Sequence, residues 1–389
     1  MSAAAPAVRG LARQRLALDP VVVGLTAALL LLGLVMVTSA SVTLAARDGD
    51  PFFFLERQLL FAALGAAGAA VALRIPTTLW QRLDFALLVA SFVLLLMVLI
   101  PGIGHEVNGS RRWVRLAGFN FQASEAARVL LLIYLCSYLV RREDELRASV
   151  LGFLKPLAVL GAAALLLLVE PDFGSGVVLL ATGIGVVFLA GVRLRHFLAL
   201  CGFAALAVAA LALSSAYRVR RLTAFLDPWA DPFNTGFQLT QSLIAIGRGE
   251  LTGVGLGGSI QKLFYLPEAH TDFVFAVLAE ELGLVGILLV VALVLALAWR
   301  ALTIARRAAE AGLKFQAYLA AAFGIWFGLQ AFINMGVNMG LLPTKGLTLP
   351  LLSYGRSSLV VTLGWVGLLL RVHHETVCSR SAAPRGGVR

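Results

Sequence analysis

The stretch LPEAHTDFVFAVLAEELG, residues 266–283, combines carboxylates with a strongly apolar run. Asp272 stands where the polar part gives way to the apolar part. We expect it near a helix N-terminus, where the helix dipole favours a negative charge. A carboxylate held at the N-terminal end of a helix can act as a general base. The alternative is that Asp272 caps the helix and does nothing more.

Glu280 and Glu281 lie inside the apolar run. Eight residues of helix separate Glu280 from Asp272, which corresponds to about 12 Å, so we expect a different site. Ionisable residues within membrane segments are rare and partnered. We expect this pair to bind neighbouring helices in the bundle interior, and a proton path is the functional alternative.

Several cations stand in other loops. NGSRRW, residues 108–113, holds Arg111 and Arg112 next to Trp113. Guanidinium groups match phosphate oxygens in two-pronged hydrogen bonds, so this cluster predicts phosphate binding. Lipid headgroup contacts, with Trp113 as an interfacial anchor, are the alternative. Lys345 and Arg356, in GLLPTKGLTLPLLSYGRSS, add two more cations.

Ser124 and Glu125 precede another apolar run and resemble a helix N-cap. Arg128 lies one turn further in, where an arginine needs a partner. EPDFGS, residues 170–175, contains a turn whose carboxylates are structural or functional with equal weight. Asn334 and Asn338, four residues apart, can bond to one partner helix.

The composition indicates a membrane protein. Of 389 residues, 60% are hydrophobic and 14% charged, and the mean hydropathy is +0.90; such a chain uses lipid as its solvent. The net charge of +11 fits basic loops better than a nucleic-acid partner. Three scattered cysteines support neither disulfides nor a metal site.

Ten charge-poor stretches predict an all-α polytopic protein, because an open sheet cannot satisfy its backbone in lipid. We expect one integral domain over 20–371, with tails at 1–19 and 372–389. The ten expected spans are 20–43, 57–74, 83–103, 125–140, 153–169, 174–192, 196–215, 271–298, 316–338 and 352–370.

The lysines and arginines favour cytoplasmic N- and C-termini. The opposite face then carries residues 105–128, 170–175, 338–358 and a large loop, 216–270, between spans 7 and 8. The unusual polar residues therefore share one face. Cations there suggest a phosphate-bearing lipid substrate, and Asp272 suggests a base.

Five segments together carry a family resemblance: VNGSRRWVRL, FQASEAAR, EPDFGS, PEAHTDFVFAVLAEELG and GLLPTKGLTLPLLSYGRSS. They resemble the SEDS family, the FtsW/RodA/SpoVE group, and the division branch more than the elongation branch. The resemblance implies a peptidoglycan glycosyltransferase that polymerises lipid II at the outer face of the bacterial inner membrane, at the septum. It also implies a class B penicillin-binding protein as transpeptidase partner, besides other division proteins and membrane lipids.

The resemblance also implies roles for individual residues. Asp272 matches the family's essential aspartate, and Lys345 matches its PTKG lysine. Arg111 or Arg112 matches the arginine of NGSRRW. Arg128 replaces the family's usual lysine, which pairs with that aspartate, and Arg356 replaces the usual glycine of SYGGSS. We expect the pyrophosphate to be bound, or Asp272 to be held, by four of these cations: Arg111, Arg112, Arg128 and Lys345.

Three readings remain open beside a division polymerase: a lipid II flippase, an elongation-type polymerase and a scaffold without activity. A divalent cation, Mg²⁺ or Mn²⁺, is compatible with a pyrophosphate leaving group, although no metal ligand set stands out in the sequence.

Overall fold

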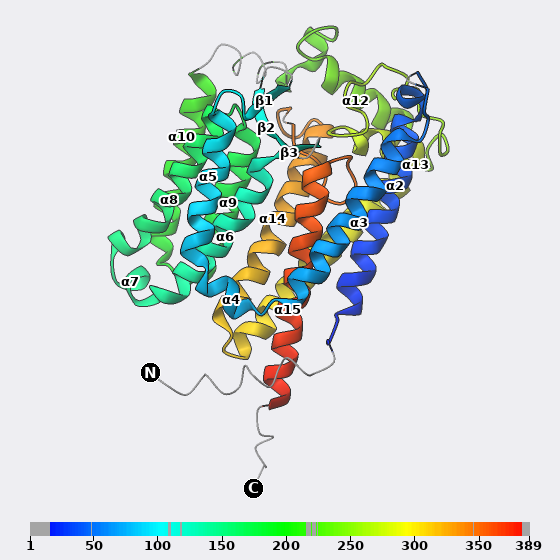
Figure 1. Ribbon diagram of the computed structural model, residues 1–389. Coiled ribbons are helices and arrows are strands. Elements are labelled where there is room, and N and C mark those ends of the chain that lie inside the picture. The colour runs from blue at the N-terminus through cyan, green and yellow to red at the C-terminus, as the bar shows by residue number, and fades with distance from the viewer. Residues whose placement is uncertain are drawn as a thin grey trace.

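The computed structural model describes residues 16–47, 49–107, 110–116, 119–214, 219, 223, 225–344 and 346–382. These residues form a bundle of long helices with a small sheet at one end (Figure 1). The helices are α2 Pro20–Arg47, α3 Phe53–Arg74, α4 Thr77–Arg82, α5 Asp84–Leu99, α6 Ala123–Arg141, α7 Glu143–Ala148, α8 Val150–Val169, α9 Phe173–Leu189, α10 Leu194–Leu213, α12 Phe237–Arg248, α13 Val274–Glu310, α14 Lys314–Asn338 and α15 Arg356–Ala382, with a 3-10 turn at Pro228–Ala230.

Each of the ten expected spans coincides with a long helix, so a polytopic helical membrane fold is confirmed. Within the described chain, α2, α3, α6, α8, α13 and α14 are long and apolar enough to cross a membrane, and α5 and α9 are shorter apolar helices. The count of ten crossings stays a prediction. The last helix continues to Ala382, through much of the segment expected as a tail.

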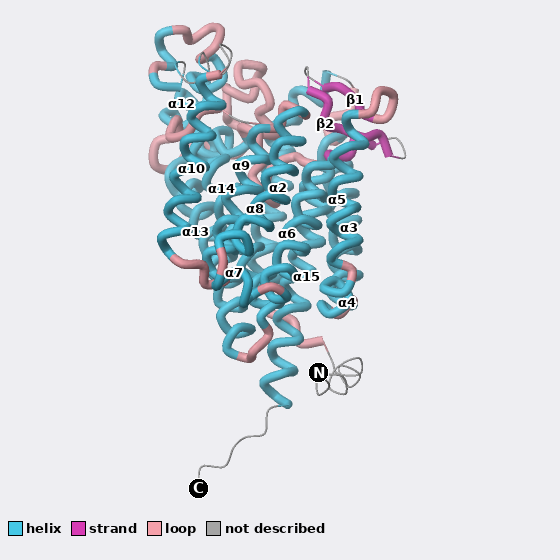
Figure 2. Tube along the Cα trace, turned by 90° about the vertical axis from the view of Figure 1, so that its left-hand side faces the viewer, coloured by secondary structure: helices cyan, strands magenta, loops and turns pink. Residues whose placement is uncertain are grey.

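One small sheet accompanies the helices, and it leaves the expected all-α class unchanged. The strands β1 Gly104–Val107, β2 Ser110–Leu116 and β3 Phe119–Gln122 form an antiparallel sheet in the order β1-β2-β3. It lies beyond the helix ends (Figure 2). The objection to an open sheet concerns hydrocarbon, so it does not apply to a sheet at this position.

The sheet, α12 and the segment between α14 and α15 lie at the same end of the bundle, which we call the loop end (Figures 1 and 2). The start of α2 and the end of α15 lie at the opposite end. Both described chain ends are therefore on one side, as the distribution of basic residues predicted. Which compartment that side faces stays a prediction.

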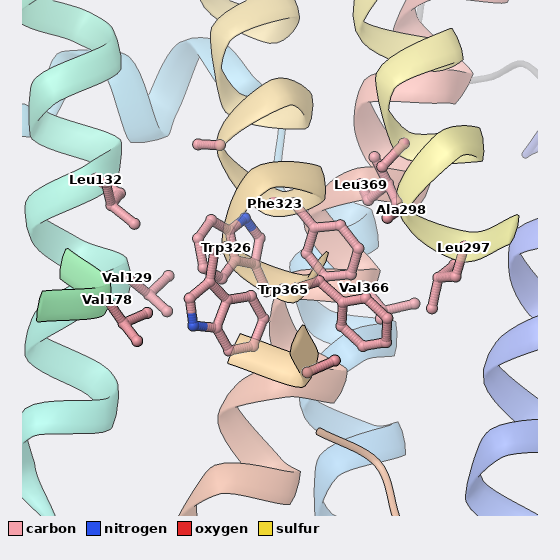
Figure 3. Packing of buried hydrophobic residues seen from close by; sticks show 14 of the residues in the cluster. Val129, Leu132, Val178, Leu297, Ala298, Phe323, Trp326, Trp365, Val366 and Leu369 are labelled. Carbon is pink, nitrogen blue, oxygen red and sulfur yellow. The ribbon is translucent and has the colours of Figure 1, made fainter. Parts of the chain in front are cut away.

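The core is aromatic where α14 meets α15 (Figure 3). Trp326 and Trp365 stack with ring centroids 4.8 Å apart, and Phe323 meets both rings edge-on. All three side chains are fully buried. Such large, rigid groups fix neighbouring helices in one arrangement, and α14 thereby becomes a rigid support for what its loop end carries.

Helix α13 is interrupted at Gly283, where φ is +63°. The large loop pairs the backbone groups that the break leaves without helical partners. The N–H groups of Val254 and Gly255 donate to the carbonyls of Glu280 and Glu281, at 3.0 and 3.1 Å. Just past the break, the N–H groups of residues 284 and 285 donate to the carbonyls of residues 250 and 251. Broken helices are tolerated at membrane depth when their backbone is paired in this way.

Candidate active site

Asp272 lies at the loop end, two residues before α13 begins at Val274. Its backbone carbonyl accepts hydrogen bonds from two side-chain amides of α14, Asn334 at 2.9 Å and Asn338 at 3.1 Å. The expected bond to a partner helix is found for Asn338, which accepts from the N–H of Ala276 in α13, whereas Asn334 bonds to the turn before α13 and to the carbonyl of Leu347. The attachment fixes the peptide of Asp272 to the rigid helix α14.

The carboxylate of Asp272 is partly buried, and no described residue donates a hydrogen bond to it. It lies close to the backbone of the PTKG segment: a Cβ atom at Gly346 would be 3.2 Å from Asp272 Oδ2. Burial raises the pKa of Asp272 to about 7, with further upward contributions from Glu268 and Asp172 and an opposing one from Arg112. Such a carboxyl is poised to exchange a proton near neutral pH.

Arg112 reaches the site from strand β2. Its guanidinium donates to the backbone carbonyls of Glu170, at 3.4 Å, and Pro171. Its charge acts on both Asp272 and Glu170. Among the described residues, Arg112 is therefore the cation whose charge acts on the Asp272 carboxylate.

The other two residues of the RRW group are placed differently. Arg111 is exposed and 4.0 Å from the exposed Glu106, an arrangement that contributes little to stability and leaves the guanidinium available. Trp113 is partly buried in the same strand. Their proposed roles stay predictions.

Two carboxylates of EPDFGS, for which a structural and a functional role were both open, lie near Asp272. Asp172 caps α9 by accepting from the N–H of Ser175, and it also accepts from Ser124 Oγ and Gln122 Nε2. Glu170 is fully buried, and neither of its carboxylate oxygens has a partner among the described residues. Burial, reinforced by Asp172, raises the pKa of Glu170 to about 8. The signal available in the sequence was two carboxylates directly after an apolar helix.

Arg128 is one of the most deeply buried side chains, with 1% exposure. It pairs with Glu125 on the same helix, and its guanidinium lies 5.0 Å from the centroid of the Trp326 ring. The need for a partner inside the span is confirmed, and that partner is Glu125 rather than Asp272. The expected contact of Arg128 with pyrophosphate stays a prediction, which this buried position does not favour.

Ser124 is not a helix cap, contrary to our expectation. Helix α6 already begins at Ala123, and no side chain caps it. The Ser124 hydroxyl instead donates to Asp172 Oδ2 at 3.1 Å. It thus links α6 to the turn that carries Glu170.

The segment before α15 is only partly described. Lys345 lies outside the described residues, so its predicted role is not placed. Arg356 donates through Nε to the Tyr354 hydroxyl at 3.2 Å. Tyr354 in turn packs against His270, with ring centroids 5.6 Å apart. Arg356 therefore contacts Tyr354, and of the two only Tyr354 reaches the segment that leads into Asp272.

Glu280 and Glu281 form what we call the carboxylate clamp, together with Arg248, Ser259 and Lys262. Glu280 accepts from Arg248, from the Ser259 hydroxyl and from the N–H groups of residues 260 and 261. Glu281 accepts from Lys262 Nζ at 2.7 Å and from Ser39 Oγ. The pair is buried and bonded to neighbours, as expected, but most partners belong to the large loop rather than to other helices.

A metal site would need a small protein ligand set. In the described parts of the chain no three His, Cys, Asp or Glu side chains gather closely enough to hold an ion. Mg²⁺ is often held by one or two carboxylates together with substrate phosphates, and Asp272, with its unbonded carboxylate, could serve as such a ligand. A requirement for a divalent cation stays open.

The chain matches the FtsW/RodA/SpoVE cell cycle protein model over residues 20–377. It is 59% identical to the probable peptidoglycan glycosyltransferase FtsW of Thioalkalivibrio sulfidiphilus, covering 90% of this chain and 88% of the relative. It is 56% identical to the protein of the same name from Halorhodospira halophila, covering 95% and 93% of the two chains.

Solved structures share the fold. A chain of a peptidoglycan synthase complex that coordinates polymerization and crosslinking aligns with a TM-score of 0.77 and 33% identity, covering 93% of this chain and 99% of that one. The rod shape determining protein RodA of Thermus thermophilus aligns with a TM-score of 0.68 and 30% identity, covering 92% and 98% of the two chains.

Proposed function

This chain belongs to the FtsW/RodA/SpoVE family of cell cycle proteins and is a peptidoglycan glycosyltransferase, and we propose that its active site is the region around Asp272. The observation that carries the proposal is the Asp272 carboxylate, which has no described hydrogen-bond donor and a pKa of about 7. Its backbone is attached to the rigid helix α14, and the charge of Arg112 acts on it. We call Asp272, Arg112, Glu170 and Asp172 the Asp272 site.

The proposed substrate is lipid II, which the family resemblance implies. In the reaction, the 4-hydroxyl oxygen of an acceptor sugar forms a bond to the anomeric carbon of a donor. The bond from that carbon to the pyrophosphate breaks, and the electron pair leaves with the lipid pyrophosphate. Asp272 accepts the hydroxyl proton. The linkage changes from α to β in one displacement, so no enzyme nucleophile is required.

The departing pyrophosphate needs positive charge. Arg112 supports this role, because its guanidinium lies beside the carboxylates of the site and bonds only to backbone carbonyls among the described residues. Arg111 is available on the same strand. Lys345 and Arg128 stay candidates from the resemblance, Arg128 the weaker because it is buried against Glu125.

The location and partners follow from the same assignment. The protein is a multi-pass membrane protein. We propose that its loop end faces outward from the bacterial inner membrane, with both chain ends in the cytoplasm, and that it acts at the septum. A class B penicillin-binding protein is the proposed transpeptidase partner, in keeping with the structural match to a chain of a peptidoglycan synthase complex.

A flippase was the main alternative, because Glu280 and Glu281 could have formed a proton path. Glu280 instead accepts four hydrogen bonds from the large loop, and Glu281 is paired with Lys262 of that loop and accepts from Ser39 of α2. Both carboxylates therefore hold the loop in place, and we do not retain a flippase as a second proposal.

The test is polymerisation of purified lipid II by the protein in complex with its transpeptidase partner. Asp272→Ala should lower the rate by about 10²–10⁴-fold, the usual contribution of a general base. Asp231→Asn is the matched control, since that exposed carboxylate bonds only to its own turn, at Asn234 and Thr235. A rate for Asp272→Ala equal to that of the control would refute the proposal.

A further inference from the structure

The last turns of α14 direct two amide groups at a single carbonyl oxygen. Asn334 Nδ2 and Asn338 Nδ2 lie 2.9 and 3.1 Å from the backbone oxygen of Asp272. Both asparagines are buried, with 2% and 0% exposure. A buried amide N–H is costly unless it is hydrogen-bonded, and both Nδ2 groups meet this need at the carbonyl of Asp272, whereas Asn334 Oδ1 has no partner among the described residues.

Each asparagine also makes a second contact with the site's framework. Asn334 Nδ2 donates to the carbonyl of Leu347 at 2.6 Å, next to Gly346 and hence next to the Asp272 carboxylate. Asn338 Oδ1 accepts from the N–H of Ala276 at 3.2 Å. That N–H belongs to the first turn of α13 and is shared with the carbonyl of Phe273, at 3.0 Å.

We infer that Asn334 and Asn338 are positioning residues for the glycosyl transfer, acting through the backbone of Asp272; this rests on the proposed function. Together they fix the peptide of Asp272 against both α13 and the 346–347 segment, and so fix the direction in which the carboxylate points. A displacement of about 1 Å in such a group can cost about 10²-fold in rate. Neither asparagine is assigned a contact with substrate.

Helix α14 offers a matched control in Gln330, one turn before Asn334. Gln330 is fully buried, donates from Nε2 to the carbonyl of Thr348 at 3.1 Å and accepts from Trp326 Nε1. It is therefore an equally buried amide, attached to the same loop segment but not to Asp272. A purely structural role would make the three side chains equivalent.

The experiment compares Asn334→Leu, Asn338→Leu and Gln330→Leu in the complex with the transpeptidase partner. The measurements are kcat and KM for lipid II, and Tm for each variant. We expect kcat to fall about 10- to 100-fold in the two asparagine variants, with KM within about twofold. Gln330→Leu should keep kcat within about threefold of wild type, even if its Tm falls as much as the Tm of the asparagine variants.

The inference is overturned if kcat follows Tm equally in all three variants, or if the asparagine variants change KM alone. Should a leucine variant fail to fold, Asn334→Ser retains one donor and should fall between wild type and the loss expected for leucine; full wild-type kcat there would count against the inference. An active wild type with an inactive Asp272→Ala and unaffected asparagine variants would remove only this inference. An equally active Asp272→Ala would remove the proposed function.

Discussion

Asp272 and the pair Glu280–Glu281 belong to one short stretch of sequence, yet their surroundings are opposite. Asp272 has no described donor, and two of the charges that act on it, Glu268 and Asp172, repel its own. The carboxylate clamp is the reverse case, because Glu280 accepts four hydrogen bonds and Glu281 is paired with Lys262.

The difference separates chemistry from architecture. A carboxylate whose lone pairs are all engaged cannot accept a proton from a substrate hydroxyl, but it can hold a loop on a helix. Burial and neighbouring carboxylates destabilise the ionised form of a carboxylate that accepts no hydrogen bonds, and this raises its pKa. Buried charge alone therefore does not identify a catalytic group.

The largest effect should come from breaking one half of the clamp. Glu281→Ala leaves Lys262 buried without its carboxylate, and the loss of one partner of a buried pair typically costs about 3–5 kcal/mol. Thermal and denaturant unfolding in detergent would measure this loss. Lys262→Met should be similarly destabilising, and the double variant should recover part of the loss.

The contrast between the carboxylate clamp and Asp272 would be wrong if the clamp variants kept the stability of wild type while their folded protein had a lower kcat. The counterpart is Asp272→Ala, which should lose kcat without losing stability, because it removes a carboxylate that no described residue bonds.

The next effect concerns the break that brings the loop onto the clamp. Gly283 has φ +63°, and a Cβ atom there would lie 2.4 Å from the nitrogen of Gly253. Gly283→Ala should therefore destabilise the protein by at least about 1–3 kcal/mol, the usual cost of a strained backbone position. Gly68→Ala in α3, with no atom within 4 Å of the new Cβ, should be neutral or stabilising by up to about 1 kcal/mol. Equal Tm values for the two variants would contradict this account.

These contrasts also show what the sequence could reveal. The helical spans were predictable, because lipid demands long apolar runs at a fixed length. The break in α13 was not, since Gly283 lies within an apolar run and its partners are about 30 residues away in the loop. The small sheet could not be predicted, because its strands are short and lie in a loop between two expected spans.

The site divides in the same way. Asp272 could be singled out from residue type and position alone, and the arginine pair Arg111–Arg112 could be named, but only the fold separates Arg112 from Arg111. Glu170 and Asp172 could not be assigned, because their importance depends on Arg112, far away in the chain but in contact with the same turn. The partner of Arg128 was equally hidden, since two carboxylates were plausible and only packing against Trp326 places it beside Glu125.

A smaller effect should appear in the pH dependence of turnover. Asp272 must be deprotonated to act as a base, so kcat should rise with pH through about 7 and then level off. Glu268→Gln removes a repelling charge, lowers the pKa of Asp272 and should move this rise to lower pH. Arg112→Gln removes the attracting charge and should move it to higher pH.

Steady-state rates between about pH 5.5 and 9 would measure the shift. A rise that stays at one pH in both variants would show that another group controls it, and would remove Asp272 from the role of base.

The smallest effect on activity should come from Glu170→Gln. The carboxyl of Glu170 is fully buried without a described partner, and its pKa is raised to about 8, so it is largely neutral at pH 7 and glutamine reproduces its shape and charge. Arg112 bonds to the backbone carbonyls of this turn, which the substitution keeps. We therefore expect kcat within about twofold of wild type.

The same substitution should nevertheless change how stability depends on pH. The folded protein holds the Glu170 proton more tightly than the unfolded chain does, so this group's contribution is complete below about pH 4.5 and is lost as pH rises through about 8. Glu170→Gln should remove that decline, giving a higher Tm than wild type at pH 8 and an equal Tm near pH 4.5. Glu106→Gln, an exposed carboxylate on β1, is the control and should leave the slope unchanged. An unchanged slope for Glu170→Gln would mean that the carboxyl finds a partner in solution, whereas a tenfold fall in kcat would move Glu170 from the frame of the site into its chemistry.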